Sequence, residues 1–163
     1  MSLLVKKASA FGNQDSLEKH FDFYEPLTVH ESSLSPCVHS ILAAKINRID
    51  KAYEMYLRTS RLDLDDYNHE VHEGLHITSM AGTWLSVVQG FGGMRNFNDQ
   101  LSFDPKIPKN WKSYSFKIKY RDHTIKVFKN HEGCKFYNES DTPVSIFVSG
   151  KEVTIFNKDL VIL

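Results

Sequence analysis

The chain has 163 residues, which is enough for one or two small domains with a hydrophobic core. Its 20 basic and 20 acidic side chains balance, so no overall charge attracts nucleic acid or an acidic membrane surface. It has no run of about eighteen apolar residues, so a membrane span is not expected.

The first part of the chain has helical patterning. The end of a helix is expected over residues 3–11, and a short helix or a turn over residues 16–21. The aromatic residues at 21–24 are expected to pack mostly in a core. Serine is a favoured N-cap and proline a favoured first helical residue, so Ser35 and Pro36 predict a helix over 36–46. A second helix over 49–59 follows a break at Asn47, and the two form a helical hairpin.

A third helix is expected over residues 74–88, with broad apolar coverage. Gly82 lies in its middle, where glycine costs about 1 kcal/mol relative to alanine, so it indicates a close approach of another helix or a ligand. Gly90 is a natural stop. Residues 90–99 are expected to form a connector, and residues 101–108 a rigid passage rich in turns.

Beyond this passage the sequence alternates like strands, with hairpin-length turns between the segments. The expected strands are 113–120, 124–128, 134–137, 144–148, 153–156 and 160–163. The chain is therefore expected to be α then β: helices over 1–95, followed by a small antiparallel β-sandwich over 96–163.

Two cysteines, Cys37 and Cys134, lie far apart in apolar or mixed surroundings. They are interpreted as free thiols of a reducing compartment rather than as a disulfide or a zinc site. The apolar segment at the start of the chain is too short for a signal peptide. A cytoplasmic location is therefore expected.

His72 and His76 form a literal H-E-x-x-H pattern with Glu73, which is typical of a zinc protease helix. Gly74 interrupts the continuous helix that such a site needs, and no third ligand follows soon after. No metal is therefore expected, and His76 is interpreted as a histidine at a helix start that faces a pocket or the core.

Ser32 and Ser33 stand just before the expected helix start at Pro36. The positive end of a helix and its unpaired N–H groups favour an anion such as phosphate. Serines before a helix also act as ordinary caps, so both interpretations remain open from these residues alone.

Other patterns are less informative. Carboxylates are plentiful, but the sequence does not show which pair shares a cleft. Residues 90–93 are rich in glycine but follow a helix, so a phosphate-binding loop is not favoured there. Tyr114, Tyr120 and Tyr137 could bind carbohydrate, although alternating aromatics in a small sandwich usually pack across strands.

Three motifs carry a resemblance to a known family: FDFYEPLTVHESSLSP over 21–36, EGLHITSMAGTW over 73–84 and GFGGMR over 90–95. They resemble the late catalytic-domain signature of glycoside hydrolase family 65, which contains maltose, trehalose, kojibiose and nigerose phosphorylases. Residues 101–111 resemble the entry to the C-terminal β domain of that family. The resemblance implies the last helices of an (α/α)6 barrel followed by a β-sandwich.

The family resemblance implies an inverting disaccharide phosphorylase, in which phosphate attacks the sugar and no base is needed. Ser32 and Ser33 match the phosphate-binding serines of the family, and His76 matches its phosphate-binding histidine. No cofactor is implied, because inorganic phosphate is a co-substrate. The carboxylic acid that protonates the leaving oxygen is expected upstream of this chain, so no catalytic residue is expected within it.

The resemblance leaves several points open. The parent protein could instead be an inverting α-glucosidase or trehalase, or the chain could be a non-catalytic binding module. The acceptor sugar is not fixed, with a mild preference for maltose, and the roles of Glu31, Glu73 and Arg95 stay undetermined. If the chain is a C-terminal fragment, its barrel helices should expose apolar faces and drive self-association.

Overall fold

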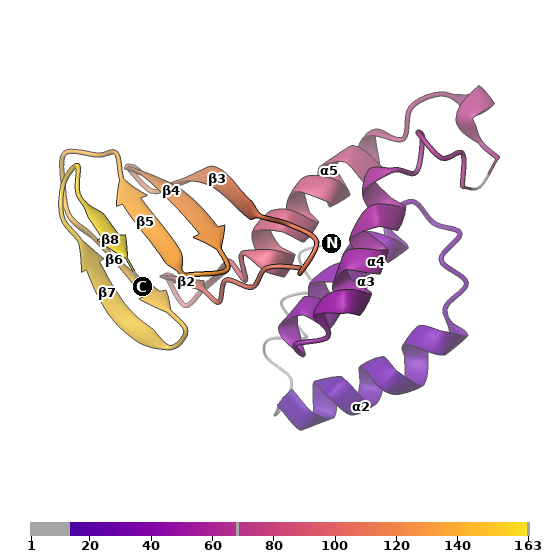
Figure 1. Cartoon of the computed structure of the whole chain (residues 1–163), viewed down its shortest axis with the longest axis horizontal. Helices are drawn as coiled ribbons and strands as arrows, with labels where there is room; N and C mark the ends of the chain where they lie inside the picture. The colour runs from indigo at the N-terminus through magenta and orange to yellow at the C-terminus, as the bar shows by residue number, and fades with distance from the viewer. Residues whose placement is uncertain (1–13, 68, 163) are drawn as a thin grey trace. The chain divides into compact units, whose positions relative to one another are not determined.

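The computed structural model describes residues 14–67 and 69–162. They fall into two compact units that divide between Ser86 and Val87: the helical unit and the β unit (Figure 1). The helix expected over residues 3–11 lies outside the described residues. Across the described ranges, no helix combines the length and the apolar character that a membrane crossing requires.

The helical unit is built on three helices that pack pairwise against one another. Figure 1 shows α3 and α4 side by side, which confirms the predicted helical hairpin. The elements of the unit are α2 (Gln14–Tyr24), the 3₁₀ turn η1 (Glu25–Leu27), α3 (Ser35–Lys45), α4 (Ile49–Ser60), the 3₁₀ turn η2 (Val71–Glu73) and α5 (Ile77–Leu85).

The third helix differs from the prediction at both ends. It begins at Ile77 rather than at Gly74, because Gly74 has φ +116° and ψ −169°, which no helical residue adopts. Beyond Leu85 the chain continues as the π-helical turn η3 (Ser86–Phe91), so it passes the predicted stop at Gly90.

The aromatic prediction for the first helix was wrong for two of the rings. α2 is longer than the expected helix and buries Phe21, but Phe23 and Tyr24 are 62% and 60% exposed. The two exposed rings contact each other edge-to-face, with centroids 4.9 Å apart. Apolar rings on this surface therefore belong to the outside of the helical unit and not to its core.

Gly82 has the role that the sequence indicated. A Cβ atom at this position would lie 2.9 Å from Cys37 Cβ on α3 and 3.3 Å from Thr59 Cγ2 on α4. The missing side chain therefore lets α5 approach both neighbouring helices. The core around this contact contains Cys37, Ile41, Ala44, Ala52 and Met55, all buried.

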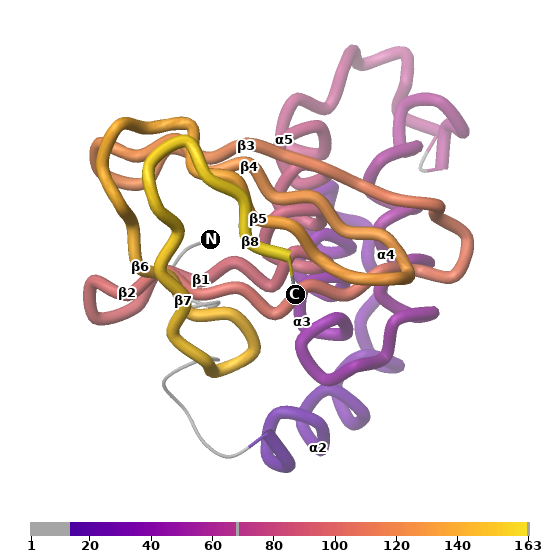
Figure 2. Tube along the Cα trace, turned by 60° about the vertical axis from the view of Figure 1, so that its left-hand side comes forward, coloured from indigo at the N-terminus to yellow at the C-terminus, as the bar shows by residue number. Residues whose placement is uncertain are grey.

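The β unit contains two four-stranded sheets, ordered β1-β2-β6-β7 and β3-β4-β5-β8 (Figure 2). Its strands are β1 (Arg95–Phe97), β2 (Gln100–Phe103), β3 (Ser113–Tyr120), β4 (His123–Asn130), β5 (Cys134–Asn138), β6 (Val144–Val148), β7 (Lys151–Ile155) and β8 (Leu160–Ile162). Inward side chains of both sheets form one core: Leu101, Phe103, Ile125, Val127, Cys134, Phe136, Val144, Ile146, Val148 and Ile155. The predicted sandwich is therefore confirmed.

Two features of this sandwich differ from the prediction. Residues 95–103 form a hairpin rather than a connector, because Asn98 and Asp99 both have positive φ and make a two-residue turn between β1 and β2. The sheets are also not wholly antiparallel, since β2 pairs in parallel with β6. A parallel partner is always distant in sequence, so alternation within a strand cannot reveal it.

Asn138 is a buried polar residue that joins the end of β5 to the loop that follows it and to the end of β7. Its Nδ2 donates to Thr142 O at 2.7 Å, and its Oδ1 accepts from Ser140 N–H at 3.0 Å. Asn138→Ala should lower the free energy of unfolding by about 2 kcal/mol, because buried polar groups lose their partners. Urea unfolding measures this loss. Asn110→Ala, at an exposed position, should change it by less than about 0.5 kcal/mol, and an equal effect at both positions would contradict the argument.

Candidate functional site

Residues 28–34 form the serine loop, which carries Ser32 and Ser33 and is held firmly at its start. His30 is buried at φ +59°, and its Nδ1 hydrogen-bonds Ser35 Oγ at 2.9 Å. Arg58 of α4 donates from Nη2 to the His30 carbonyl oxygen at 3.1 Å. The loop is thus tied to the first residue of α3 and to α4 before it reaches Ser32 and Ser33.

Ser33 contacts the start of α5. Its Oγ lies 3.0 Å from Thr78 Oγ1, although the two residues are far apart in sequence. Thr78 is the second residue of α5, so the contact brings the serine loop to the N-terminal turn of that helix. The first N–H groups of a helix lack partners within it, and its N-terminal end is positive. Hydroxyl donors and a helix N-terminus therefore meet at this point.

Ser32 is exposed and serves a local role in this structure. Its Oγ accepts from Leu34 N–H at 3.4 Å, and its carbonyl oxygen accepts from Ser35 N–H at 3.0 Å. α3 begins at Ser35 after Leu34, one residue before the predicted start. The N-cap residue of α3 is Leu34, and no side-chain hydrogen bond caps this helix, so neither serine acts as its cap. Ser32 closes the turn that precedes α3, and Ser33 reaches α5.

His76 is the N-cap residue of α5 and is oriented by a carboxylate. Its Nδ1 lies 2.5 Å from Asp63 Oδ1, and its backbone N–H donates to Asp63 Oδ2 at 3.0 Å. Its Nε2 lies 3.5 Å from Glu70 Oε2. The hydrogen bond that His76 donates to the Asp63 carboxylate raises the pKa of His76 above its ordinary value, and the same bond lowers the pKa of Asp63. The imidazole is therefore held in place and favoured in its charged form.

The pKa of His76 should fall when Asp63 is replaced. In the unmodified chain, an NMR titration should give His76 a pKa above 6.5, and Asp63→Asn should lower it. Glu70→Gln should lower it less, because Glu70 acts only as a nearby charge. A pKa that does not change in Asp63→Asn would contradict the role given to that carboxylate.

The same shifts give the pH range in which this pair stabilises the fold. The raised pKa of His76 means that its contribution is complete below about 6.5 and is lost as the pH rises through the folded pKa. The lowered pKa of Asp63 means that its contribution is complete above about 3.8 and is lost as the pH falls through the folded pKa. The pair therefore stabilises most between these two values.

The H-E-x-x-H pattern does not form a zinc protease helix. His72 lies exposed in the turn η2, Gly74 separates it from α5, and His76 is engaged by Asp63 and Glu70. The two histidines therefore do not share one helix face, as the pattern would require.

The glycine-rich motif at 90–95 acts within the β unit as a structural element. Gly93 has φ +61°, and a Cβ there would lie 2.5 Å from the backbone oxygen of Asp104. Arg95 Nη1 donates to the carbonyl oxygens of Gln89 and Met94 at 2.5 and 2.8 Å. Arg95 thus fixes the path of its own loop, which is a role that the sequence left open.

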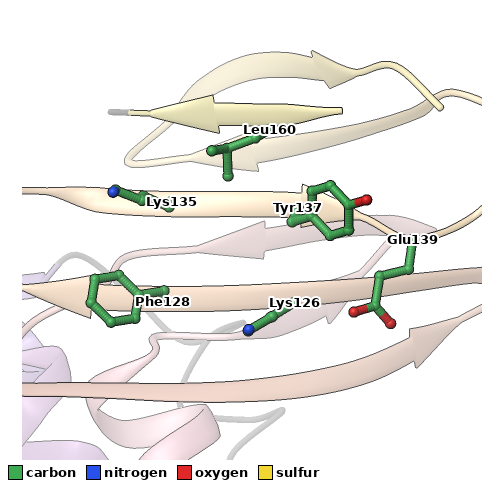
Figure 3. Close-up of a pocket in the computed structure, with 6 residues that line it drawn as sticks. All are labelled: Lys126, Phe128, Lys135, Tyr137, Glu139 and Leu160. Carbon is green, nitrogen blue, oxygen red and sulfur yellow. The ribbon is translucent and has the colours of Figure 1, made fainter. Parts of the chain in front are cut away.

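The outer face of the sheet β3-β4-β5-β8 has a hollow of about 420 Å³ (Figure 3). Its lining residues are Lys126, Phe128, Lys135, Tyr137, Glu139 and Leu160. These side chains pair across neighbouring strands, as Lys126 does with Tyr137. Of the other two candidate tyrosines, Tyr114 donates its hydroxyl to Phe91 O and Tyr120 donates to Asp99 O. The hydroxyls of Tyr114 and Tyr120 are therefore engaged by hydrogen bonds within the β unit.

Sequence reasoning missed two residues of the site at the start of α5. Thr78 supplies the hydroxyl that meets Ser33, and Asp63 orients His76. A hydroxyl two residues after a candidate histidine was a usable signal for Thr78. Asp63 lies in the segment between α4 and η2, and no local pattern could show that its partner is the N-cap residue of a later helix.

Comparison with known protein families finds matches along most of the chain. Residues 3–85 match the glycosyl hydrolase family 65 central catalytic domain, and residues 94–155 match the C-terminal domain of the same family. The catalytic-domain match falls on the helical unit, and the C-terminal-domain match falls on the β unit.

Individual relatives give the same result. Maltose phosphorylase of Bacillus subtilis (strain 168) is 62% identical over 84% of this chain, and α,α-trehalose phosphorylase of Thermoanaerobacter brockii is 45% identical over 87%. A solved structure from the human microbiome, provisionally named a kojibiose phosphorylase, superposes with a TM-score of 0.86 over 93% of this chain at 38% identity. The chain spans 18% of the length of the two curated relatives and 22% of that structure.

Proposed function

This chain belongs to glycosyl hydrolase family 65, and on that premise we propose that it supplies the phosphate-binding part of an inverting disaccharide phosphorylase. The proposed reaction converts an α-glucosyl disaccharide and phosphate to β-glucose 1-phosphate and a free sugar. The observation that supports it most is the Ser33–Thr78 contact, which brings the serine loop to the N-terminal turn of α5 directly after His76.

The chemistry of this site suits a phosphate dianion. Serine and threonine hydroxyls donate hydrogen bonds to phosphate oxygens, and a helix N-terminus adds favourable charge. Asp63 favours the protonated His76, which would add a positive charge beside the anion. Glu70 faces the Nε2 of His76 and would have to release it for phosphate to bind there.

In the proposed reaction, a phosphate oxygen attacks the anomeric carbon on the face opposite the leaving sugar oxygen. The bond from that carbon to the leaving oxygen breaks, and a carboxylic acid outside this chain donates the proton to that oxygen. The configuration inverts because the new bond forms on the opposite face. The part of this chain is to hold the nucleophile, so the isolated chain is not expected to catalyse phosphorolysis.

Maltose is the substrate that we propose, since the maltose phosphorylase of B. subtilis is 62% identical to this chain. A chimera tests the proposal: this chain replaces the matching segment of the B. subtilis enzyme. Retention of phosphate-dependent glucose 1-phosphate formation from maltose would support it. Glucose release without phosphate would favour the alternative, a hydrolase of the α-glucosidase or trehalase type. A folded chimera with neither activity would contradict both.

We also propose a cytoplasmic location, which the two buried free cysteines support.

α5 presents an apolar stripe to solvent, and we propose that it mediates self-association of the 163-residue chain. Ile77, Met80 and Trp84 recur at helical spacing and are 74%, 49% and 50% exposed. Contiguous apolar patches of this kind mark association surfaces. Light scattering should therefore detect dimers or larger species at micromolar concentration. Met80→Lys with Trp84→Glu should shift the chain toward monomer, and a monomeric unmodified chain would contradict the proposal.

A further inference from the structure

Three side chains outside the proposed phosphate site converge in the helical unit. They are Glu25 of η1, His30 of the serine loop and His39 of α3, and one ligand atom of each lies within 4.8 Å of the others. The two imidazole rings meet edge-to-face, with centroids 4.4 Å apart. Nothing in the proposed phosphorylase chemistry uses this cluster.

Two nitrogen atoms in the cluster lack hydrogen bonds. His30 Nε2 and His39 Nδ1 are both shielded from solvent and have no hydrogen-bond partner among the described residues. His30 Nδ1 is already paired with Ser35 Oγ, so Nε2 is the nitrogen left for another partner. Glu25 Oε1 lies 3.6 Å from His30 Nε2, which is too far for a hydrogen bond. Buried polar atoms normally have partners, so this arrangement needs an explanation.

We propose that Glu25, His30 and His39 form a binding site for a divalent transition-metal ion of the zinc type. Two imidazole nitrogens and one carboxylate oxygen are a common zinc ligand set, with a fourth position open to water. Ligands at the usual zinc distances stand about 3.4 Å apart in a tetrahedron. The 3.6 Å separation of Glu25 Oε1 and His30 Nε2 is close to that value, and one ligand atom of His39 lies within 4.8 Å of the ligand atoms of both residues.

The protonation states of the histidines suit metal binding. A metal ion binds neutral imidazole, and burial lowers the pKa of His30 and lowers that of His39 to about 4. Both rings therefore carry a free lone pair at neutral pH. The nitrogen ligands also select against calcium and magnesium, which prefer oxygen.

Two cations near the cluster limit the affinity. Lys51 Nζ lies 2.8 Å from Glu25 Oε1, and Arg58 lies against the His30 backbone. An ionised carboxylate offers about four lone-pair sites, so Glu25 can contact Lys51 and a metal ion together. Repulsion from Lys51 should still weaken binding, so Lys51→Gln should tighten it.

The site would connect η1, the serine loop and α3 through one ion. His30 begins the loop that leads to Ser32 and Ser33, so an ion here would fix the start of that loop. This role is structural and does not depend on the proposed phosphorylase reaction. A failure of the phosphorolysis test would leave the metal proposal standing, and the reverse also holds.

Titration of the metal-free 163-residue chain with Zn²⁺ and Co²⁺ tests the proposal. Calorimetry should give one equivalent of Zn²⁺ with a Kd in the micromolar range or below, and bound Co²⁺ should show the visible bands of tetrahedral coordination. His39→Ala and Glu25→Gln should each weaken binding at least tenfold. His72→Ala, which removes an exposed histidine outside the cluster, should leave the Kd unchanged.

A second measurement does not depend on variants that could misfold. In the unmodified chain, zinc should shift the NMR ring signals of His30 and His39 and leave those of His72 in place. The proposal is overturned if no zinc binds, if the signals of His72 move instead, or if Glu25→Gln and His39→Ala bind as the unmodified chain does.

Discussion

Replacing both Ser33 and His76 by alanine is expected to lower kcat/KM for phosphate by about 100-fold or more in the B. subtilis chimera. Each side chain would donate a charge-assisted hydrogen bond to the phosphate, worth about 1.5–3 kcal/mol, and about 1.4 kcal/mol corresponds to a factor of ten. The lower kcat/KM should result mainly from a higher KM for phosphate, whereas the KM for maltose should change little. Initial rates over a range of phosphate concentrations measure both effects.

Two variants serve as controls for this experiment. His72→Ala removes the other histidine of the H-E-x-x-H pattern, and Glu31→Gln neutralises the exposed carboxylate beside the serines. Both should change kcat/KM for phosphate by less than about threefold, because neither side chain is expected to touch phosphate. If Ser33→Ala and His76→Ala raised the KM for maltose and spared that for phosphate, the assignment of a phosphate site would be wrong.

Gly93→Ala is expected to destabilise the β unit by about 3 kcal/mol or more. The backbone of Gly93 has φ +61°, a conformation that costs other residues about 1–2 kcal/mol. The added Cβ would also lie 2.5 Å from Asp104 O and 2.7 Å from Asp104 N, and backbone atoms cannot move aside cheaply. Overpacking of this kind adds about 1–3 kcal/mol.

Gly150 provides a matched control within the same unit. It also has positive φ, at +80°, but a Cβ there would meet no atom within 4 Å. Gly150→Ala should therefore cost only the backbone term, about 1–2 kcal/mol. Urea unfolding of the two variants separates backbone strain from steric overlap. Equal losses would show that the close approach to Asp104 contributes nothing.

The parts of the fold that the sequence predicted well are those with strong local patterns. α3 and α4 follow from apolar spacing and from the Ser-Pro start, and the long strands follow from alternation. The predicted start of α5 was wrong, because a continuous apolar pattern concealed the break in the helical backbone at Gly74. The hairpin of β1 and β2 was missed because its strands are too short for alternation to show.

The functional residues were harder to place, because their partners are distant in sequence. Ser33 and His76 could be named from the family motif, but Thr78 and Asp63 became visible only through tertiary contacts. Tertiary structure was also needed to reveal the buried ring nitrogens of His30 and His39 that lack hydrogen-bond partners. Neither residue stands in a metal-binding spacing, and the literal metal motif at 72–76 pointed elsewhere.

The parallel pairing of β2 with β6 sets an order on how the β unit can assemble. Strands β3, β4 and β5 lie between β2 and β6 in the sequence. During synthesis, β2 therefore has no parallel partner until these three strands and β6 have been made. The adjacent hairpins of β3, β4 and β5 need only short loops to close and should form first. Until β6 arrives, β2 keeps an unpaired edge on which a nascent chain can aggregate.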